Sequence, residues 1–311
     1  SAQRAVVVQS MQAMLNSNQD IRDDESRVFN LMATPGYPEL IGEMISLNND
    51  RGLTAFIVGD SPATLDSSAT SINEWGTNVN LAVEDNANGL TSRDEYLGVY
   101  YPWGFTSDNA GNNVVVPPSH MMLRTIALSD QVSFPWFAPA GTRRGGITNA
   151  TATGYIDNEG EFVSIALNEG QRDTLFGISV NPITFIIGAG LVCFGQKTRA
   201  KNASALDRVN GARLVIYMRS QLNKLAKPYI FEPNDKITRD EIKNAAESLM
   251  LELVGSRALY DYIVVCDESN NTPSRIDRNE LYLDIAIEPV KAVEFIYIPL
   301  RLKNTGEIAG L

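Results

Sequence analysis

The sequence has very few of the residues that build metal sites and nucleophilic sites. Its 311 residues include one histidine, His120, and two cysteines, Cys193 and Cys266. A single histidine excludes any site that needs two imidazole ligands from this chain, and we expect His120, at a predicted helix start, to cap or pack. Both cysteines lie in apolar, strand-like surroundings, which favours buried thiols over a disulfide.

Motifs of catalysis and cofactor binding are also missing. There is no G-x-S-x-G and no P-loop lysine. Gly188, Gly190 and Gly195 have the spacing G-x-G-x4-G and precede strand-like residues, unlike a dinucleotide-binding loop. An acidic patch at 20–25 lacks the glycine and the alternating ligands of a calcium loop, so it predicts a solvated turn. We expect a protein that is not an enzyme and that binds no cofactor and no metal.

Basic charge and long hydrophobic runs are scarce as well. The net charge of −11 argues against a sequence-independent grip on nucleic acid, which needs a basic stripe. The longest apolar run, 183–195, contains glycines and is too short to cross a bilayer. We expect neither nucleic acid nor a membrane as a partner. A helical pattern follows Ser1 directly, with no initiator Met and no signal-peptide pattern, so we interpret the sequence as a fragment or a processed product.

The residues that are present indicate a globular protein of mixed α/β and α+β class. Apolar residues make up 44% and charged residues 20% of the chain. Short apolar runs alternate with helical patterns, which predicts an α/β layer with a mainly parallel sheet. The expected helices are 2–16, 38–47, 68–78, 119–128, 169–176 and 211–226, and the expected strands are 28–32, 53–58, 96–103 and two within 181–196.

We predict two domains. Residues 1–180 form an α/β domain with surface insertions near 85–113, where the stretches 85–92 and 106–113 are rich in loop residues. Residues 181–311 form a C-terminal domain in which a small β-sheet packs against helices and keeps an open edge.

The best-determined helix of the last third is 238–254. Thr238 begins a capping box, apolar residues then recur at helical spacing, and Gly255 ends the pattern. The opposite, polar face is either a solvated surface or a docking face for a partner. The candidate docking residues are Arg239, Lys243 and Glu247.

Three strand-like runs follow, at 259–266, 281–288 and 293–302. The second alternates apolar and polar residues, as a half-buried strand does. The third is apolar on both faces and contains Pro299, so it belongs at a sheet edge, at a bulge or partly outside its own domain. We predict that this run is exchanged between subunits. The candidate exchange residues are Val293, Phe295, Ile296, Tyr297, Ile298, Leu300 and Leu302.

A glycine-rich loop, APAGTRRGG at 138–146, carries Arg143 and Arg144 beside an aromatic cluster. Two arginines in such a loop can hold an anion or the carboxylate of a partner. A plain surface loop is the alternative interpretation.

Six segments in the same order resemble the tail sheath proteins of contractile-tailed bacteriophages. They cover the chain from about residue 117 to its end. The segments are PPSHMMLRTIALSD (117–130), PWFAPAGTRRGGI (135–147), NPITFIIGAGLVCFGQKTR (181–199), YIFEPND (229–235), VVCDESNNTPSRID (264–277) and AIEPVKAVEFIYIPLRL (286–302).

The resemblance implies a structural protein of the virion. Such subunits stack as rings around a tail tube and contract to drive the tube through the host envelope for genome ejection. Their C-terminal domain faces the tube and pairs its edge strands with arms from neighbouring subunits. The implied partners are other copies of the chain, the tail tube protein, the baseplate and the tail terminator, with assembly in the host cytoplasm.

Within that resemblance, two expectations concern this chain in particular. The residues that face the tube are expected on the polar side of the 238–254 helix. The usual N-terminal arm is expected before Ser1, so we expect this chain to be monomeric or only loosely assembled.

Other functions remain open at this stage. The sheath of a type VI secretion system or of a phage-tail-like bacteriocin is the nearest alternative. An α/β enzyme in the first 180 residues would need a deep pocket with convergent polar groups. A receptor-binding or adhesin module would expose aromatic patches on loops.

Overall fold

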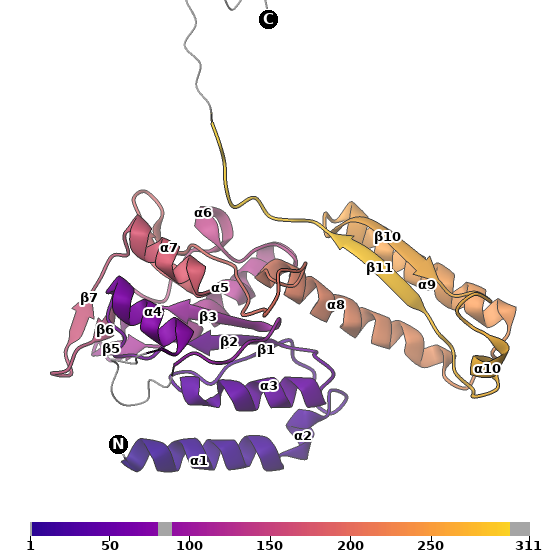
Figure 1. Cartoon of the computed structure of the whole chain (residues 1–311), viewed down its shortest axis with the longest axis horizontal. Helices are drawn as coiled ribbons and strands as arrows, with labels where there is room; N and C mark the ends of the chain where they lie inside the picture. The colour runs from indigo at the N-terminus through magenta and orange to yellow at the C-terminus, as the bar shows by residue number, and fades with distance from the viewer. Residues whose placement is uncertain (1, 80–88, 299–311) are drawn as a thin grey trace, which may run out of the picture.

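The main sheet joins strands that are far apart in the sequence, from residue 31 to residue 193. The computed structural model describes residues 2–79 and 89–298. Five strands lie in the order β1-β2-β3-β8-β9, and all neighbours are parallel except β8 and β9 (Figure 1). The predicted α/β layer with a mainly parallel sheet is therefore confirmed. The strands are β1 (Leu31–Met32), β2 (Phe56–Asp60), β3 (Leu97–Tyr101), β8 (Asn181–Ile186) and β9 (Gly190–Cys193).

Helices cover both faces of this sheet. Because side chains alternate along a strand, Ile57 of β2 packs into one core and its neighbours Phe56 and Val58 pack into the other. The first core contains α3 (Ile41–Asp50), α4 (Ala69–Thr77) and α7 (Glu169–Gly177), and the second contains α5 (Pro118–Val132) and α8 (Val209–Ala226). Other helices, outside these two cores, are α1 (Ala2–Ser17), α2 (Gln19–Arg22), η1 (Pro38–Leu40), α6 (Gly141–Arg144) and η2 (Lys227–Tyr229).

A second sheet was not expected from the sequence. Four antiparallel strands lie in the order β5-β4-β6-β7. The stretch 106–113, predicted as a loop insertion, instead completes a hairpin of β4 and β5, because Thr106 pairs with Val114 across a turn around Gly111. The first half of the stretch 85–92 lies outside the described residues. The strands are β4 (Trp103–Ser107), β5 (Asn113–Val116), β6 (Ala152–Ile156) and β7 (Phe162–Ser164).

The C-terminal part projects from the main body along α8. Figure 1 shows α8 running from the main sheet to a separate layer of α9 and the β10–β11 pair. Trp136 joins this layer, since its indole Nε1 donates to the Ser256 carbonyl at 3.0 Å. The elements are α9 (Lys236–Gly255), β10 (Leu259–Val265), α10 (Pro273–Ile276) and β11 (Asp284–Pro289).

The predicted boundary at residue 180 divides strands that the structure pairs. Tyr100 and Tyr101 of β3 pair with Asn181 and Pro182 of β8, so β8 and β9 belong to the main sheet. The apolar run of β8 was assigned to the C-terminal part by its position in the sequence. Its pairing partner β3, which the sequence does not specify, lies in the stretch predicted as the first domain.

The predicted N-cap of the long helix is wrong by three residues, since the cap is Asp235 and not Thr238. α9 begins at Lys236, because the Asp235 carboxylate accepts a hydrogen bond from the Thr238 amide at 2.9 Å. Thr238 is therefore a residue of the first turn and not the cap. Aspartate and threonine are both good caps, and the aspartate lies one turn earlier. The predicted end is one residue early, because Gly255 is the last helical residue and Ser256 is the C-cap.

A buried carboxylate fixes the start of α5. Asp60, at the end of β2, is 2% exposed. Its Oδ1 accepts the Ser119 amide at 2.6 Å, and its Oδ2 accepts the Ser119 hydroxyl and the Gly36 amide, both at 2.8 Å. Burial raises the pKa of Asp60 to about 6, and these hydrogen bonds oppose the rise.

We predict that Asp60 makes stability depend on pH. A carboxyl whose folded pKa lies above its unfolded value stabilises the fold most at low pH, and this contribution is lost as pH rises through about 6. The variant Asp60→Asn has no carboxyl to titrate at this position and serves as the reference. The free energy of unfolding of the parent, relative to that of the variant, should fall by on the order of 2 kcal/mol as the pH rises from about 4 to about 8. Urea unfolding at each pH measures the difference, and a flat difference would contradict the prediction.

Candidate strand-exchange surface

The β10–β11 pair is a sheet of only two strands among residues 2–79 and 89–298. The strands are antiparallel, with Tyr262 opposite Ile287 and Val264 opposite Ile285. Each strand therefore has one hydrogen-bonded side and one outer edge without a partner strand in this part of the chain. Two-stranded ribbons are marginally stable in water unless something covers one face.

One face of the pair is covered and the other is open. Val264 is 6% exposed and packs with residues of α8 and α9, and Ile285 and Ile287 pack against the same core. On the other face Tyr260 is 63% and Ile263 is 64% exposed. The alternation predicted for 281–288 is confirmed, because the odd positions of β11 are half-buried and its even positions are exposed. The ribbon thus presents two free edges and an open outer face on which exposed apolar side chains stand among carboxylates such as Asp284 and Glu288.

The run after β11 is not a strand in this chain. The described part of the predicted strand 293–302 has no strand pairing, and its apolar side chains are 64–87% exposed. The sequence predicted a strand because the run is apolar on both faces, but a strand also needs a partner strand, and these residues have none among those described. The exposed residues of this segment are Val293, Phe295, Ile296, Tyr297 and Ile298, while Leu300 and Leu302 lie outside the described residues.

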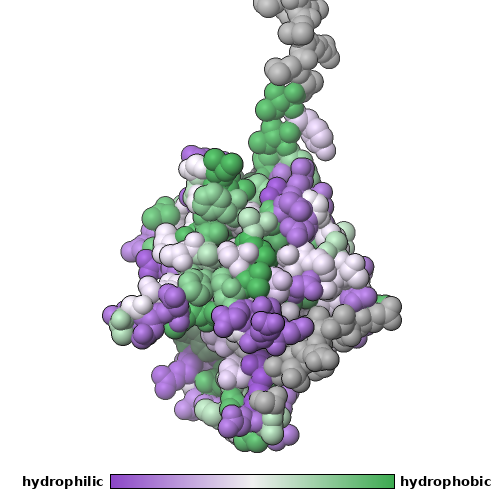
Figure 2. All heavy atoms as spheres, turned by 90° about the vertical axis from the view of Figure 1, so that its left-hand side faces the viewer, coloured by the Kyte–Doolittle hydropathy of each residue, from purple (hydrophilic) through white to green (hydrophobic). Residues whose placement is uncertain are grey.

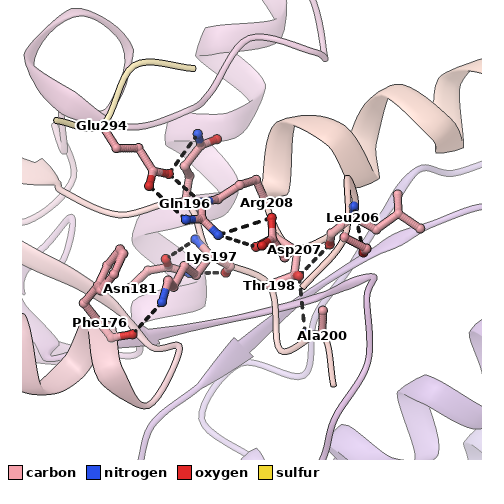
Figure 3. Close-up of polar contacts among 11 residues, drawn as sticks. Phe176, Asn181, Gln196, Lys197, Thr198, Ala200, Leu206, Asp207, Arg208 and Glu294 are labelled. Atoms are coloured by element: carbon pink, nitrogen blue, oxygen red, sulfur yellow. Dashed lines mark hydrogen bonds and ion pairs between the residues drawn. The ribbon is translucent and has the colours of Figure 1, made fainter. Parts of the chain in front are cut away.

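Two contacts fasten the beginning of this segment. The Val290 amide donates to the Ala258 carbonyl at 2.9 Å, and the Asn210 side chain donates to the Val290 carbonyl at 3.3 Å. Four residues further on, Arg208 donates two hydrogen bonds to the Glu294 carboxylate, from Nε to Oε1 at 2.6 Å and from Nη2 to Oε2 at 3.0 Å (Figure 3). Beyond this pair the segment stands clear of the surface as a hydrophobic extension (Figure 2).

The surroundings of Glu294 are basic and aromatic. Phe295 meets the Phe176 ring edge-on at 6.1 Å, and Lys197 Nζ lies 3.5 Å from the centre of the same ring. The hydrogen bonds from Arg208 to Glu294 raise the pKa of that guanidinium. Burial, and then the positive charge of Arg208, lower the pKa of Lys197.

Sequence reasoning missed the partner of Glu294. Arg208 stands before α8 in a polar stretch with no motif, and nothing in its neighbourhood pointed to a residue 86 positions away. One signal was available: Glu294 is the only charged residue between 292 and 298. A lone carboxylate in an apolar run invites the question of what neutralises it.

The structure corrects part of the predicted polar face of α9. Arg239 is 7% exposed, and its Nη1 donates to the Asn234 carbonyl and side chain, so it cannot belong to an exposed docking face. It follows the Asp235 cap, at a position of the first turn that faces the chain entering the helix. Lys243 and Glu247 do lie together on the surface, with 4.0 Å between Lys243 Nζ and a Glu247 carboxylate oxygen.

The structure places the two loop arginines on the short helix α6. The Arg144 guanidinium stacks on the Phe137 ring at 4.8 Å, and Arg257 from the end of α9 lies 5.8 Å from the same ring. Arg143 is exposed. Among the described residues none of these three arginines has a carboxylate within ion-pair distance. The loop therefore offers positive charge in a chain that is acidic overall.

A hollow of about 920 Å³ lies between α8 and the chain around residues 24–30. The buried cations in its lining are engaged internally: Arg213 pairs with Asp130, and Arg51 donates to the backbone carbonyls of Ile21 and Arg27. These contacts are structural and give the enzyme alternative no support. Within the described residues no cluster of three potential metal ligands occurs, and no helix is long and apolar enough to span a membrane. Both cysteines are free and buried, as predicted.

The fold as a whole is that of sheath proteins from contractile injection machines. The chain resembles one in the sheath complex of an extracellular contractile injection system, PVC, in its contracted state, with a TM-score of 0.71 and 18% identity, covering 92% of this chain and 73% of that one. It also resembles a chain of the anti-feeding prophage baseplate in the contracted state, with a TM-score of 0.71 and 19% identity, covering 94% and 76%.

Sequence relatives then give the family. Residues 201–303 match the family described as phage tail sheath C-terminal domain. The chain is 34% identical over 253 residues to the tail sheath protein of Vibrio phage KVP40, covering 78% of this chain and 36% of that protein. It is 34% identical over 192 residues to that of Enterobacteria phage T4, covering 60% and 27%. The chain belongs to the phage tail sheath family and spans about a third of the length of these relatives.

We predict an alternating pattern of amide exchange in the β10–β11 pair. In an antiparallel pair, successive amides point alternately to the partner strand and to the outer edge. Inward amides should be protected from exchange, while outward amides should exchange at least tenfold faster because only solvent covers them. Hydrogen exchange followed by NMR at neutral pH measures this, and amides of β2, inside the main sheet, are the control. Uniform protection along both strands would contradict the prediction.

Proposed function

We propose that this chain acts as a structural subunit of a bacteriophage contractile tail sheath. Such a sheath polymerises as stacked rings around the tail tube and contracts to drive the tube through the host envelope for genome ejection. The observation that supports this proposal best is the β10–β11 ribbon with two unpaired edges, next to an apolar segment, 293–298, that nothing among the described residues covers. Strand exchange needs a segment that one subunit donates and an unpaired strand edge that another subunit offers.

Physical magnitudes favour exchange between copies. Five or six residues added to a free edge form a few ladder hydrogen bonds, each contributing about 0.5–1.5 kcal/mol net. Burying the exposed side chains adds about 25 cal/mol for each Å² of apolar surface removed from water. One junction is therefore of moderate strength, and repetition around a ring makes the whole lattice durable.

The partners follow from the proposed role. They are other copies of the chain in a helical array, the tail tube protein, the baseplate and the tail terminator, in a virion assembled in the host cytoplasm. The role is mechanical and needs no catalysis. Within the chain, we place the start of the strand-exchanging domain after β9, since β8 and β9 pair with the main sheet. Lys243 and Glu247 remain our candidates for the face toward the tube.

A sheath of a related contractile injection system is the second candidate. The structural resemblance to chains of PVC and anti-feeding prophage assemblies supports it. The sequence identity favours the phage role, because it is 34% to phage sheath proteins and 18–19% to those chains.

We predict that a synthetic peptide of residues 290–302 binds a β10 or β11 edge. Added to isotope-labelled chain, the peptide should protect outward amides of that strand. A peptide with Phe295→Asp and Tyr297→Asp should bind at least tenfold more weakly, because burying each aromatic ring is worth about 1.5–3 kcal/mol.

The control variant changes other exposed apolar residues of the chain. Ile230→Asp with Phe231→Asp alters side chains that are 60% and 101% exposed and lie outside the ribbon. The parent peptide should bind this variant as it binds the parent chain. Equal binding of the two peptides, or protection confined to other elements, would rule out strand donation by this segment.

We also predict that the α6 arginines contribute to contacts between copies. Arg143→Glu with Arg144→Glu should weaken self-association in sedimentation velocity at least fivefold at low salt and less at high salt, as screened ion pairs do. Lys201→Glu with Lys224→Glu changes the net charge equally and is the matched control. If both pairs of substitutions have the same effect, the loop has no special role.

A further inference from the structure

The C-terminal segment is held by two different parts of the molecule. At Val290 it is still bonded to Ala258, at the start of β10 in its own layer. At Glu294 it is bonded to Arg208, which precedes α8, and at Phe295 it touches Phe176 of α7 in the main body. Figure 1 shows the chain crossing from the end of β11 back toward the body before it leaves the surface.

The contact at Glu294 is more defined than an ordinary surface ion pair. The carboxylate meets the guanidinium through two parallel hydrogen bonds, the geometry that fixes orientation as well as distance. Both side chains are largely buried, at 24% and 26% exposed. The Gln196 side chain also donates to the Glu294 carboxylate, at 3.5 Å. A partly buried pair is screened less by salt than an exposed one.

The position of Arg208 is itself fixed by the fold. Its backbone forms a bridge with Lys197, and it is the N-cap residue of α8. A cation at a helix N-terminus is opposed by the helix dipole, and a carboxylate placed there compensates. Asp207 already pairs with Arg208 at 3.2 Å, and Glu294 adds a second carboxylate at this end of α8, which gives the chain an electrostatic reason to pass over this point (Figure 3).

The fastening ends immediately after this contact. Ile296, Tyr297 and Ile298 are 75–87% exposed and make no hydrogen bond or aromatic contact within the described residues. The ion pair thus lies at the boundary between the part of the segment that is attached to its own subunit and the part that is available for donation.

We propose that Arg208 and Glu294 are positioning residues for strand donation. Their ion pair sets the point at which residues 296–298 leave the subunit and the direction in which they leave. This direction is fixed relative to the main body and α8, and not relative to the β10–β11 layer. It also keeps the segment from folding back onto the free edges of its own ribbon. This inference rests on the proposed exchange of strands between copies and adds the residues that aim the donated strand.

The test follows the segment in the single, unassembled chain. Spin labels at Ile298→Cys and at Asp173→Cys, an exposed position of α7, report the distance from the segment to the body, while Cys193 and Cys266 are buried. The parent should give one narrow distance distribution. Glu294→Gln and Arg208→Gln should each broaden it, and trypsin should cleave after Lys291 about fivefold faster, as expected when an ion pair of this kind is lost.

A charge swap and a matched control separate positioning from general destabilisation. Arg208→Glu with Glu294→Arg restores opposite charges and should return the distribution and the cleavage rate toward those of the parent. Glu280→Gln removes a different ion pair, with Arg278, and should change neither. The proposal is overturned if Glu294→Gln behaves like the parent, if Glu280→Gln has the same effect, or if the swap restores nothing.

Because these measurements need no partner, they are independent of the peptide experiment. Failure of the peptide to bind would refute strand donation and leave the anchoring result unaffected. An unchanged distance distribution would refute the positioning role and leave strand donation intact.

Discussion

The ladder of hydrogen bonds between β10 and β11 is the interaction on which the C-terminal part of the chain depends. A ribbon of two strands is marginal by itself, and here it persists because α8 and α9 cover one of its faces through residues such as Met218, Met250 and Leu253. The same helices leave both outer edges uncovered. Stability of the single subunit and readiness for a further strand thus have one origin, namely a sheet that is supported from one face and not from its sides.

α8 connects this ribbon rigidly to the rest of the molecule. Val209 and Ile216 pack into the core beneath the main sheet, whereas Leu214 and Met218 pack into the core of the ribbon layer. The helix is continuous over both sets of contacts. Arg213, 3% exposed, adds an ion pair with Asp130 of α5 at the same place. Because a packed helix moves as a unit, a pull on the edge of the ribbon is carried to the main sheet instead of being absorbed in a loose linker.

Sequence patterns predicted what depends on local periodicity and missed what depends on distant partners. The helix at 238–254 and the alternation at 281–288 were correct because 3.6-residue and two-residue repeats are local properties. The second sheet was missed because its strands are short, and the run at 106–113 reads as a turn until Val114 pairs with Thr106. The predicted domain limit at 180 separates two paired strands for a related reason, since the sequence of β8 does not specify that β3 is its neighbour.

The candidate site also divides into features that the sequence predicts and features that depend on distant partners. The run 293–302 is apolar on both faces, and its need for outside partners could be inferred from this pattern. The place at which the run leaves the subunit could not be inferred. That depends on Glu294, whose charge interrupts the apolar run. An uninterrupted apolar segment invites unselective pairing, and natural sequences place charges beside such segments to prevent it. In this chain the interrupting carboxylate is neutralised by Arg208 of the same subunit, so it limits unselective pairing at its own position and leaves residues 296–298 as the apolar stretch that another copy can receive.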